Sequence, residues 1–400
     1  KLGVPRGVAV DRDGNVILSE FAYNRVQKLS PDFKPVWDLQ AFYCYLGTAD
    51  QTDPQWIYAF EGPMLPVIKQ FHIDYDTGKW DLTRAWYFHK YDDAGSYYGY
   101  PSTGGGAVTL DGHKFVYVQH KTMRIYRLDG DDLVPVVRIG PRVSYERPDG
   151  SIFFFSRDNN RLPARLFIWH DDNHDRRVFE REVDALPLEV VQQRNIYYRG
   201  TDGDIDRYGN VYMGNMVFKI QGVVDGIPRY DWDHLEVMNL SLPNRPVNSF
   251  GVSGMGVDDA GNRYYAVSEN HAGNPDFPGL TFWAKRQGWQ HVAKYTPDGT
   301  LLWRAGRKAI GKVLPGSFSY VDSVDWAGGF VFVADMDGYV HVFTDDGLFV
   351  TRMFSGTREG ADQDKDPYAI TSNELGHVKA ITHPRTGQVH LISQSLEGGE

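Results

Sequence analysis

The chain has 400 residues, of which 42% are hydrophobic and 24% are charged, and its formal net charge is −10. This composition predicts a folded chain with a real core. The surplus of acidic residues argues against a protein that binds nucleic acid by neutralising phosphates. No apolar run reaches the roughly 18 residues that a membrane-spanning helix needs.

Cysteine usage sets a second limit. Cys44 is the single cysteine, so an intramolecular disulfide and a CxxC metal or redox motif are both excluded. An acidic chain rich in Tyr and Trp and nearly free of cysteine is typical of exported bacterial proteins. We therefore expect an extracellular or periplasmic location.

A hairpin unit recurs along the chain. Each copy is a short apolar strand, a turn of the Asp-x-x-Gly-Asn type and a second apolar strand, because Gly and Asn tolerate the positive φ that closes a hairpin. Units begin near residues 6, 42, 106, 141, 201, 253, 320 and 377. Two further short strands follow in several copies. Repeated four-stranded units of this length are the blades of a β-propeller.

Residues 5–32 read PRGVAVDRDGNVILSEFAYNRVQKLSPD and resemble the NHL-repeat propeller family. The copy at 320–347 is also similar, and the other copies diverge. The pattern predicts an all-β protein, a propeller of seven or eight four-stranded blades that occupies residues 1–400 as one domain. The last unit, near residue 377, lacks its outer strands, so the last blade is expected to be incomplete.

One aspartate position repeats between the first and second strands. It holds Asp11, Asp206, Asp258 and Asp325. A carboxylate repeated in this way is expected to cap the turn by accepting backbone N–H bonds. The segment 202–210 resembles a calcium loop, but the same turn already explains Asp206 and Asn210.

A second repeated position, at the end of the second strand, is polar in seven of the eight copies but varies in chemistry. Its residues are Glu20, His120, Arg157, Asn215, Glu269, Asp335 and Gln394. In a propeller these strand ends surround one mouth of the central channel. We expect a ligand or metal site there; the alternative is that strand ends are polar because they meet water.

The longest insertion, residues 269–290, leaves a second strand on that same face. It carries His271, Phe282, Trp283 and Trp289, and long loops on a rigid scaffold commonly bind ligands. Exposed aromatic rings stack on sugars or on apolar side chains. The alternative is a small core in which these rings cover one another.

An acidic run, Asp362, Asp364 and Asp366, lies in a Gly-rich segment. Oxygen ligands at alternate positions suit Ca²⁺, although the Gly and Glu of an EF-hand are out of place. A solvated acidic loop is the alternative. No other cofactor is indicated.

Three functions are compatible with these patterns. The first is an exported module whose strand-exit face recognises a polysaccharide or a protein. The second is a lyase or hydrolase acting on an acidic carbohydrate, with His120 or His271 as base, Arg142 or Arg157 against the substrate carboxylate, Glu269 beside them and a divalent ion as an option. The third is a structural unit within a longer chain that carries further domains.

Overall fold

A computed structural model describes the backbone of most of the chain. The described residues are 5–20, 25–40, 46–60, 67–74, 77, 79–87, 104–120, 122–141, 143, 145–153, 166–194, 196, 203–238, 250–269, 290–306, 321–335, 339–353 and 375–395. Nearly all ordered elements in these ranges are antiparallel β-strands, which confirms the all-β prediction. No helix in these ranges is long and apolar enough to cross a membrane.

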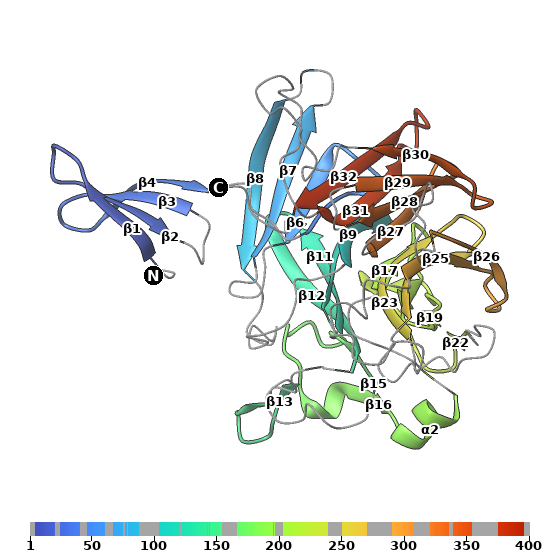
Figure 1. The fold of residues 1–400 in the computed structure, drawn as a ribbon. Coiled ribbons are helices and arrows are strands. Elements are labelled where there is room, and N and C mark those ends of the chain that lie inside the picture. Colours follow the sequence, from blue (N-terminus) through green and yellow to red (C-terminus); the bar gives the residue numbers. More distant parts are fainter. Residues whose placement is uncertain are drawn as a thin grey trace, which may run out of the picture.

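Six sheets form a closed ring, which is the architecture of a β-propeller (Figure 1). We number these sheets blades I to VI. Blade I is β5 (Leu46–Ala49), β6 (Trp56–Phe60), β7 (Val67–Asp74) and β8 (Lys79–Tyr87); blade II is β9 (Gly104–Leu110), β10 (His113–His120), β11 (Thr122–Asp129) and β12 (Asp132–Gly140). Blade III is β17 (Gly203–Ile205), β18 (Val211–Met213), β19 (Met216–Phe218) and β22 (Leu235–Val237).

The other half of the ring repeats this plan. Blade IV is β23 (Phe250–Val257), β24 (Arg263–Glu269), β25 (Gln290–Tyr295) and β26 (Leu301–Ala305); blade V is β27 (Val321–Ala327), β28 (Phe330–Asp335), β29 (Tyr339–Thr344) and β30 (Phe349–Met353). Blade VI has β31 (Leu375–Thr382) and β32 (Val389–Ser395), so its sheet has two strands among the described residues, as its sequence predicts. The first strands β5, β9, β17, β23, β27 and β31 contact one another in this order, and β31 returns to β5.

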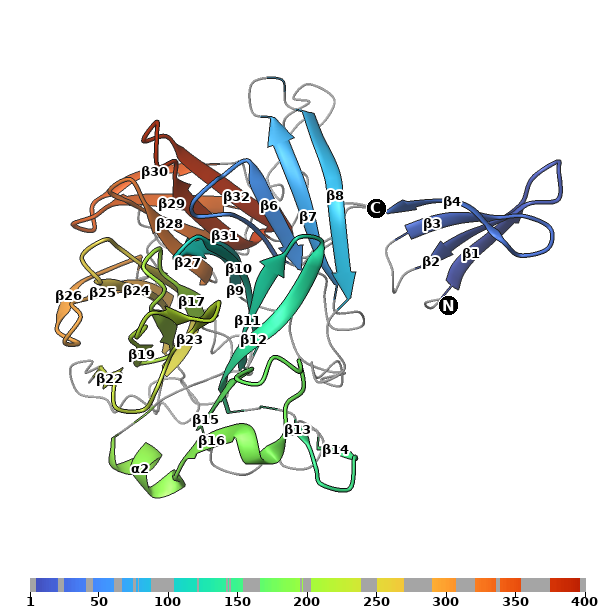
Figure 2. The ribbon, with the colours of Figure 1, turned by 180° about the vertical axis from the view of Figure 1, so that it is seen from behind.

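A seventh sheet lies outside this ring. It contains β1 (Pro5–Val10), β2 (Val16–Glu20), β3 (Arg25–Leu29) and β4 (Pro35–Gln40), in the strand order of a blade. Figures 1 and 2 both place it beyond β8 and not between two ring blades. The described units therefore number seven, with the last one incomplete.

The unit predicted near residue 141 is not a separate blade. Its strands β15 (Leu166–His170) and β16 (Val183–Leu186) add to the outer edge of blade II, which becomes a sheet of six strands. The strands β13 (Tyr145–Glu146) and β14 (Ile152–Phe153) form a separate sheet of two strands. The remaining small elements are η1 (Glu180–Glu182), α2 (Leu188–Gln193) and the hairpin β20 (Val223–Val224) and β21 (Ile227–Pro228).

The core lies between neighbouring blades. Between blades IV and V it contains Val292, Val324 and Phe343, all nearly inaccessible to solvent. Full burial of such a side chain contributes about 2 kcal/mol relative to leaving it exposed. Successive side chains of a strand point to opposite faces of its sheet, and each blade packs against a neighbour on both faces. The strands therefore carry apolar residues on both faces. Polar residues of the first strands line the channel.

Candidate functional site

A cavity of about 630 Å³ opens at one mouth of the channel. Its walls include the turns that join the first and second strands in blades III, IV, V and VI. The lining residues are Thr48, Gln51, Asp204–Tyr208, Asn210, Tyr212, Lys219, Val257–Gly261, Asp325, Trp326, Gly328, Gly329, Lys379–Pro384 and Gly387. This is the mouth opposite to the one predicted, because the second strands run away from these turns and end on the far face.

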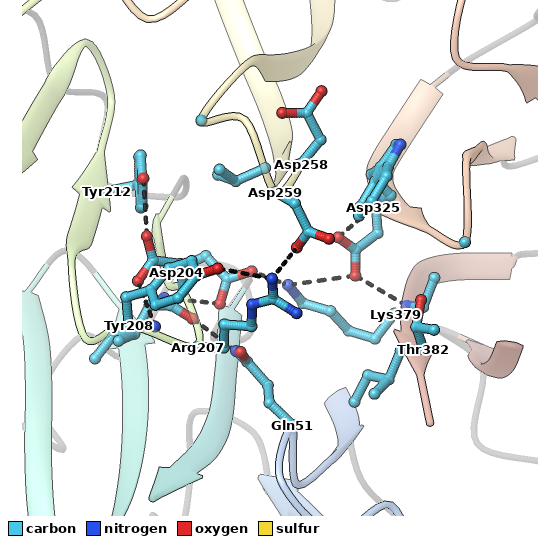
Figure 3. Close-up of a pocket in the computed structure, with 18 of the residues that line it drawn as sticks. Gln51, Asp204, Arg207, Tyr208, Tyr212, Asp258, Asp259, Asp325, Lys379 and Thr382 are labelled. Atoms are coloured by element: carbon cyan, nitrogen blue, oxygen red, sulfur yellow. Dashed lines mark hydrogen bonds and ion pairs between the residues drawn. The ribbon is translucent and has the colours of Figure 1, made fainter. Parts of the chain in front are cut away.

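An ion-pair network forms the floor of the cavity. Lys379 Nζ lies 2.7 Å from Asp204 Oδ2 and 3.8 Å from Asp325 Oδ2. These side chains come from the first strands of blades VI, III and V, and blades III and VI are opposite one another in the ring. Figure 3 shows Lys379 extending between the two carboxylates. The pair therefore bridges the channel from side to side.

Blades I and II hold the far end of this bridge. Tyr117 donates its hydroxyl to Asp204 Oδ1 at 2.6 Å, and Gln51 Nε2 donates to the Tyr117 hydroxyl at 3.0 Å and to the Ile205 carbonyl at 2.6 Å. Gly106 makes room for the tyrosine, because a Cβ there would lie 2.5 Å from the Tyr117 hydroxyl oxygen. Five of the six blades thus contribute side chains to one polar network.

Electrostatics at the floor are set by two carboxylates that share one ammonium. Burial and the neighbouring Asp204 raise the pKa of Asp325 to about 6, against the opposing effect of Lys379. The two carboxylates keep the pKa of Lys379 above its ordinary value despite burial. The floor therefore carries a lysine that stays charged and an aspartate that gains and loses a proton near pH 6.

The side chains at the rim of the cavity are exposed, and Arg207 contacts two of its neighbours there. Arg207 Nη2 lies 3.2 Å from Asp259 Oδ1 and donates to the Tyr208 hydroxyl at 2.7 Å. The side chains of Arg207 and Asp259 are 54% and 59% exposed, and Tyr208 is 56% exposed. Screened pairs of this kind contribute little to stability, so they can be exchanged for contacts with a ligand.

The repeated turn aspartate behaves as predicted in three units. Asp206 Oδ1 accepts the backbone N–H groups of Tyr208 and Asn210, both at 2.9 Å. Asp258 binds Ala260 and Asn262 in the same way, and Asp11 binds Asp13 and Asn15. Gly209 follows this geometry with φ of +92°.

Asp325 breaks the pattern, and the expectation that it caps a turn is wrong. Gly329 stands where the other units have Asn, so the strand continues to Ala327 and turns tightly at Gly328-Gly329. Asp325 instead accepts the Ala380 N–H of blade VI at 2.9 Å and faces Lys379. Gly256 of blade IV permits this approach, since a Cβ there would lie 2.8 Å from the Asp325 Cα.

The predicted ring of polar strand ends is only partly described. Glu20, His120, Glu269 and Gln394 lie at or near the ends of second strands, as expected, but their side chains lie outside the described residues. Asn215 is 1% exposed and donates through Nδ2 to the Met238 carbonyl at 3.0 Å. Asp335 is 2% exposed, and its Oδ2 lies 3.5 Å from His341 Nε2. These two side chains make internal contacts and not an open ligand site.

The remaining predicted site residues fall outside the described ranges. They are Arg142, Arg157, His271, Phe282, Trp283, Trp289, Asp362, Asp364 and Asp366. In the described part of the chain no group of three or more His, Cys, Asp or Glu side chains is arranged to hold a metal ion. The lyase or hydrolase site and the calcium site therefore stay predictions.

Two residues of the cavity floor, Asp204 and Lys379, were not among the predicted site residues, although the sequence carries a signal for them. Asp204 lies two residues before the turn aspartate Asp206, and Lys379 lies in the first strand of the last unit. In the structure Lys379 lies in the middle of β31 and lines the cavity. The useful signal is a charged residue inside a first strand, where other units place small or apolar residues.

Comparison of the sequence with protein-family models and with curated proteins finds no match. Similar solved structures include Sqt1 from Chaetomium thermophilum, at 10% identity with a TM-score of 0.45, covering 98% of this chain and 97% of that chain. BamB from Moraxella catarrhalis has 13% identity, a TM-score of 0.37 and coverage of 97% and 93%. The β-propeller domain of Cps50 (Swd1) from Myceliophteria thermophila has 9% identity, a TM-score of 0.37 and coverage of 84% and 94%. The propeller assignment rests on the strand topology described above.

Proposed function

We propose that this protein is a binding propeller whose turn-face cavity receives a basic side chain from a protein partner. The observation that carries the proposal is the charge of the cavity. Its lining holds five aspartates, Asp204, Asp206, Asp258, Asp259 and Asp325, against three Lys and Arg residues, Arg207, Lys219 and Lys379. An entering ammonium or guanidinium group meets a surplus of negative charge.

The contacts within the cavity favour a cation over an anion. Asp206 accepts hydrogen bonds from neutral donors, which are two backbone N–H groups and the Tyr212 hydroxyl, at 2.9 Å. These donors leave its negative charge without compensation. At the floor, Lys379 serves both Asp204 and Asp325. A second cation near Asp325 would lower the pKa of that carboxyl and be stabilised by the charge that results.

The rim supports a protein as the source of that cation. Turns from several blades form a broad, rigid border, on which a partner surface rests while one long side chain enters. The exposed ring of Tyr208 offers a face for cation–π contact, which Arg207 occupies now at 4.9 Å from the ring centroid. A flexible alkyl stem with a charged tip fits an acidic cavity with an aromatic rim.

The test uses a short fluorescent peptide with one lysine in a neutral sequence, and the same peptide with acetyl-lysine. We expect the lysine peptide to bind more tightly, and Asp259→Asn and Tyr208→Ala each to weaken binding several-fold while the fold is retained. Asp132→Asn is the matched control, because it removes an exposed charge at the start of β12, where its Oδ2 lies 3.8 Å from Arg176 Nη1. Equal binding of the two peptides, or equal loss in the control, would contradict the proposal.

The earlier predictions of a polysaccharide ligand, of export and of NHL membership receive no support from the described residues. All three remain predictions, and the polysaccharide site was predicted on the strand-exit face. The peptide test separates the two faces, since a carbohydrate site on the insertion 269–290 would be unaffected by Asp259→Asn.

A further inference from the structure

In two units the turn aspartate binds a lysine as well as the backbone of its turn. In blade IV, Lys294 Nζ lies 3.3 Å from Asp258 Oδ2. In the sheet β1–β4, Lys28 Nζ lies 2.7 Å from Asp11 Oδ2. Both lysines belong to the third strand of the unit whose turn they reach. The chain thus supplies a positive charge to each of these carboxylates.

The two lysines occupy the same place in the strand register. Lys294 pairs with Tyr264 of the second strand, and Tyr264 follows the turn aspartate by six positions. Lys28 pairs with Ile17, which also follows its turn aspartate by six positions. The residue opposite this position in the third strand is therefore the one whose side chain reaches the turn.

Blade I obtains its cation from the neighbouring blade. Asp50 accepts the backbone N–H groups of Thr52 and Asp53 in the turn between β5 and β6, at 2.8 and 3.3 Å. Lys114, near the beginning of β10 in blade II, places its Nζ 2.6 Å from Asp50 Oδ2. The chain therefore has two routes to a turn aspartate: the third strand of the same unit, and the second strand of the next blade.

The first route is closed in blade III. Tyr212 follows Asp206 by six positions, and its partner in the third strand is Val217. A valine thus stands where two other units have a lysine. Val217 is buried and packs in one apolar cluster with Tyr212. The third strand of blade III therefore gives Asp206 no positive charge.

The second route ends on an aromatic ring. Arg263 lies at the beginning of β24 in blade IV, much as Lys114 lies near the beginning of β10. Its guanidinium carbon is 5.3 Å from the centroid of the Tyr212 ring, and it forms no ion pair with Asp206 in the part of the chain that the structure describes. Arg263 therefore contacts the tyrosine and leaves the carboxylate without a cation.

The other cations at this wall of the cavity have carboxylate partners of their own. Arg207 Nη2 lies 3.2 Å from Asp259 Oδ1, and Lys219 Nζ lies 3.4 Å from Glu236 Oε2. Within the described ranges, every hydrogen bond that Asp206 accepts comes from a neutral donor. Its side chain is partly exposed and lines the cavity. Asp206 is thus a turn aspartate that is open to a cation from outside the chain.

We propose that the ammonium group of the partner's lysine binds Asp206, in the place that Lys294 takes at Asp258. This inference rests on the proposed function and adds to it the carboxylate that the ligand engages. The Tyr212 hydroxyl donates to Asp206 Oδ2 at 2.9 Å, as the Tyr264 hydroxyl donates to Asp258 Oδ2 at 3.0 Å. The partner thereby completes in blade III an arrangement that blade IV completes from its own sequence.

Val217→Lys tests the proposal, because it returns to blade III the lysine that the other units carry. Val217→Met is the matched control, since it adds an unbranched side chain without the charge. We expect Val217→Lys to bind the fluorescent lysine peptide about tenfold more weakly than Val217→Met, which is the size of one hydrogen bond to a charged group. Equal binding by the two variants would overturn this inference and leave the proposed function standing.

A second pair of variants does not depend on the buried position. Asp206→Asn keeps an acceptor for the turn but removes the charge, and Asp11→Asn makes the same change in a turn that does not line the cavity. With folding verified by circular dichroism, we expect about tenfold weaker binding for Asp206→Asn and unchanged binding for Asp11→Asn. Parent-like affinity of Asp206→Asn would overturn the inference alone, whereas a parent chain that does not bind the lysine peptide would overturn the proposed function as well.

Discussion

Lys379 and Asp204 belong to opposite blades of the ring, and their charged groups meet at 2.7 Å inside the channel. Ion pairs within one blade or between adjacent blades stabilise local packing. A pair across the channel joins two halves of the ring and closes the floor of the cavity. It also fixes the position of Asp325, the third member of the network.

Replacement of Lys379 by Met should be strongly destabilising. It leaves Asp204 and Asp325 buried without a counter-charge, a change that typically costs about 3–5 kcal/mol. The second change Asp204→Asn should restore part of the loss, because one uncompensated charge disappears while the amide oxygen can still accept from Tyr117. A double-mutant cycle by urea denaturation measures this coupling. Additive effects of the two changes would show that the side chains do not interact.

The carboxyl of Asp325 should make stability depend on pH. Its pKa rises to about 6 in the folded chain, against 3.8 ordinarily, so the folded chain holds this proton more tightly than the unfolded chain. Its contribution therefore favours folding at low pH and is lost as the pH rises from about 4 to about 6. The shift corresponds to about 3 kcal/mol.

Asp325→Asn removes this proton. We expect the stability of the variant relative to the parent to increase between pH 4 and pH 7. Ionisation of the buried Asp325 carboxyl destabilises the folded parent in this range, whereas the variant has no carboxyl to ionise there. Urea denaturation at both pH values measures the difference. A constant difference across this range would show that Asp325 is ionised throughout.

The turn aspartate Asp206 should contribute to the stability of the fold. Asp206→Ala removes the acceptor for two backbone N–H groups and for the Tyr212 hydroxyl, and we expect a loss of about 1–3 kcal/mol. Urea denaturation of the variant and the parent measures this loss. Asp132→Ala, at the exposed start of β12, is the control and should stay within about 0.5 kcal/mol of the parent. An equally small loss at Asp206 would contradict its role as a turn cap.

The sequence was sufficient for the fold because the blade repeat is local. The spacing of Asp11 and Asn15, or of Asp258 and Asn262, encodes a hairpin through hydrogen bonds between residues four apart. Such contacts require no knowledge of distant segments. The two-stranded last unit was visible for the same reason. The prediction of a blade near residue 141 was wrong, because strand β15 of this unit pairs with β12 across a long loop and that pairing is not a local contact.

The cavity was not predictable in the same way. Asp204 and Lys379 are separated by 175 positions and meet only because the ring closes. Alignment of the repeats also concealed Asp325, whose position in the frame matches a turn aspartate although the two glycines after it make a different turn. Repeats predict what the blades share, whereas a site in a propeller arises where one blade departs from the others.

The most direct test of the central claim is a hydrogen-exchange footprint of the lysine peptide. Binding at the turn-face cavity predicts slower amide exchange in the turns 206–210 and 258–261, with no change in the insertion 270–289. The acetyl-lysine peptide should leave these turns unaffected. Protection confined to the insertion, with both turns unchanged, would contradict the account and return the binding site to the strand-exit face.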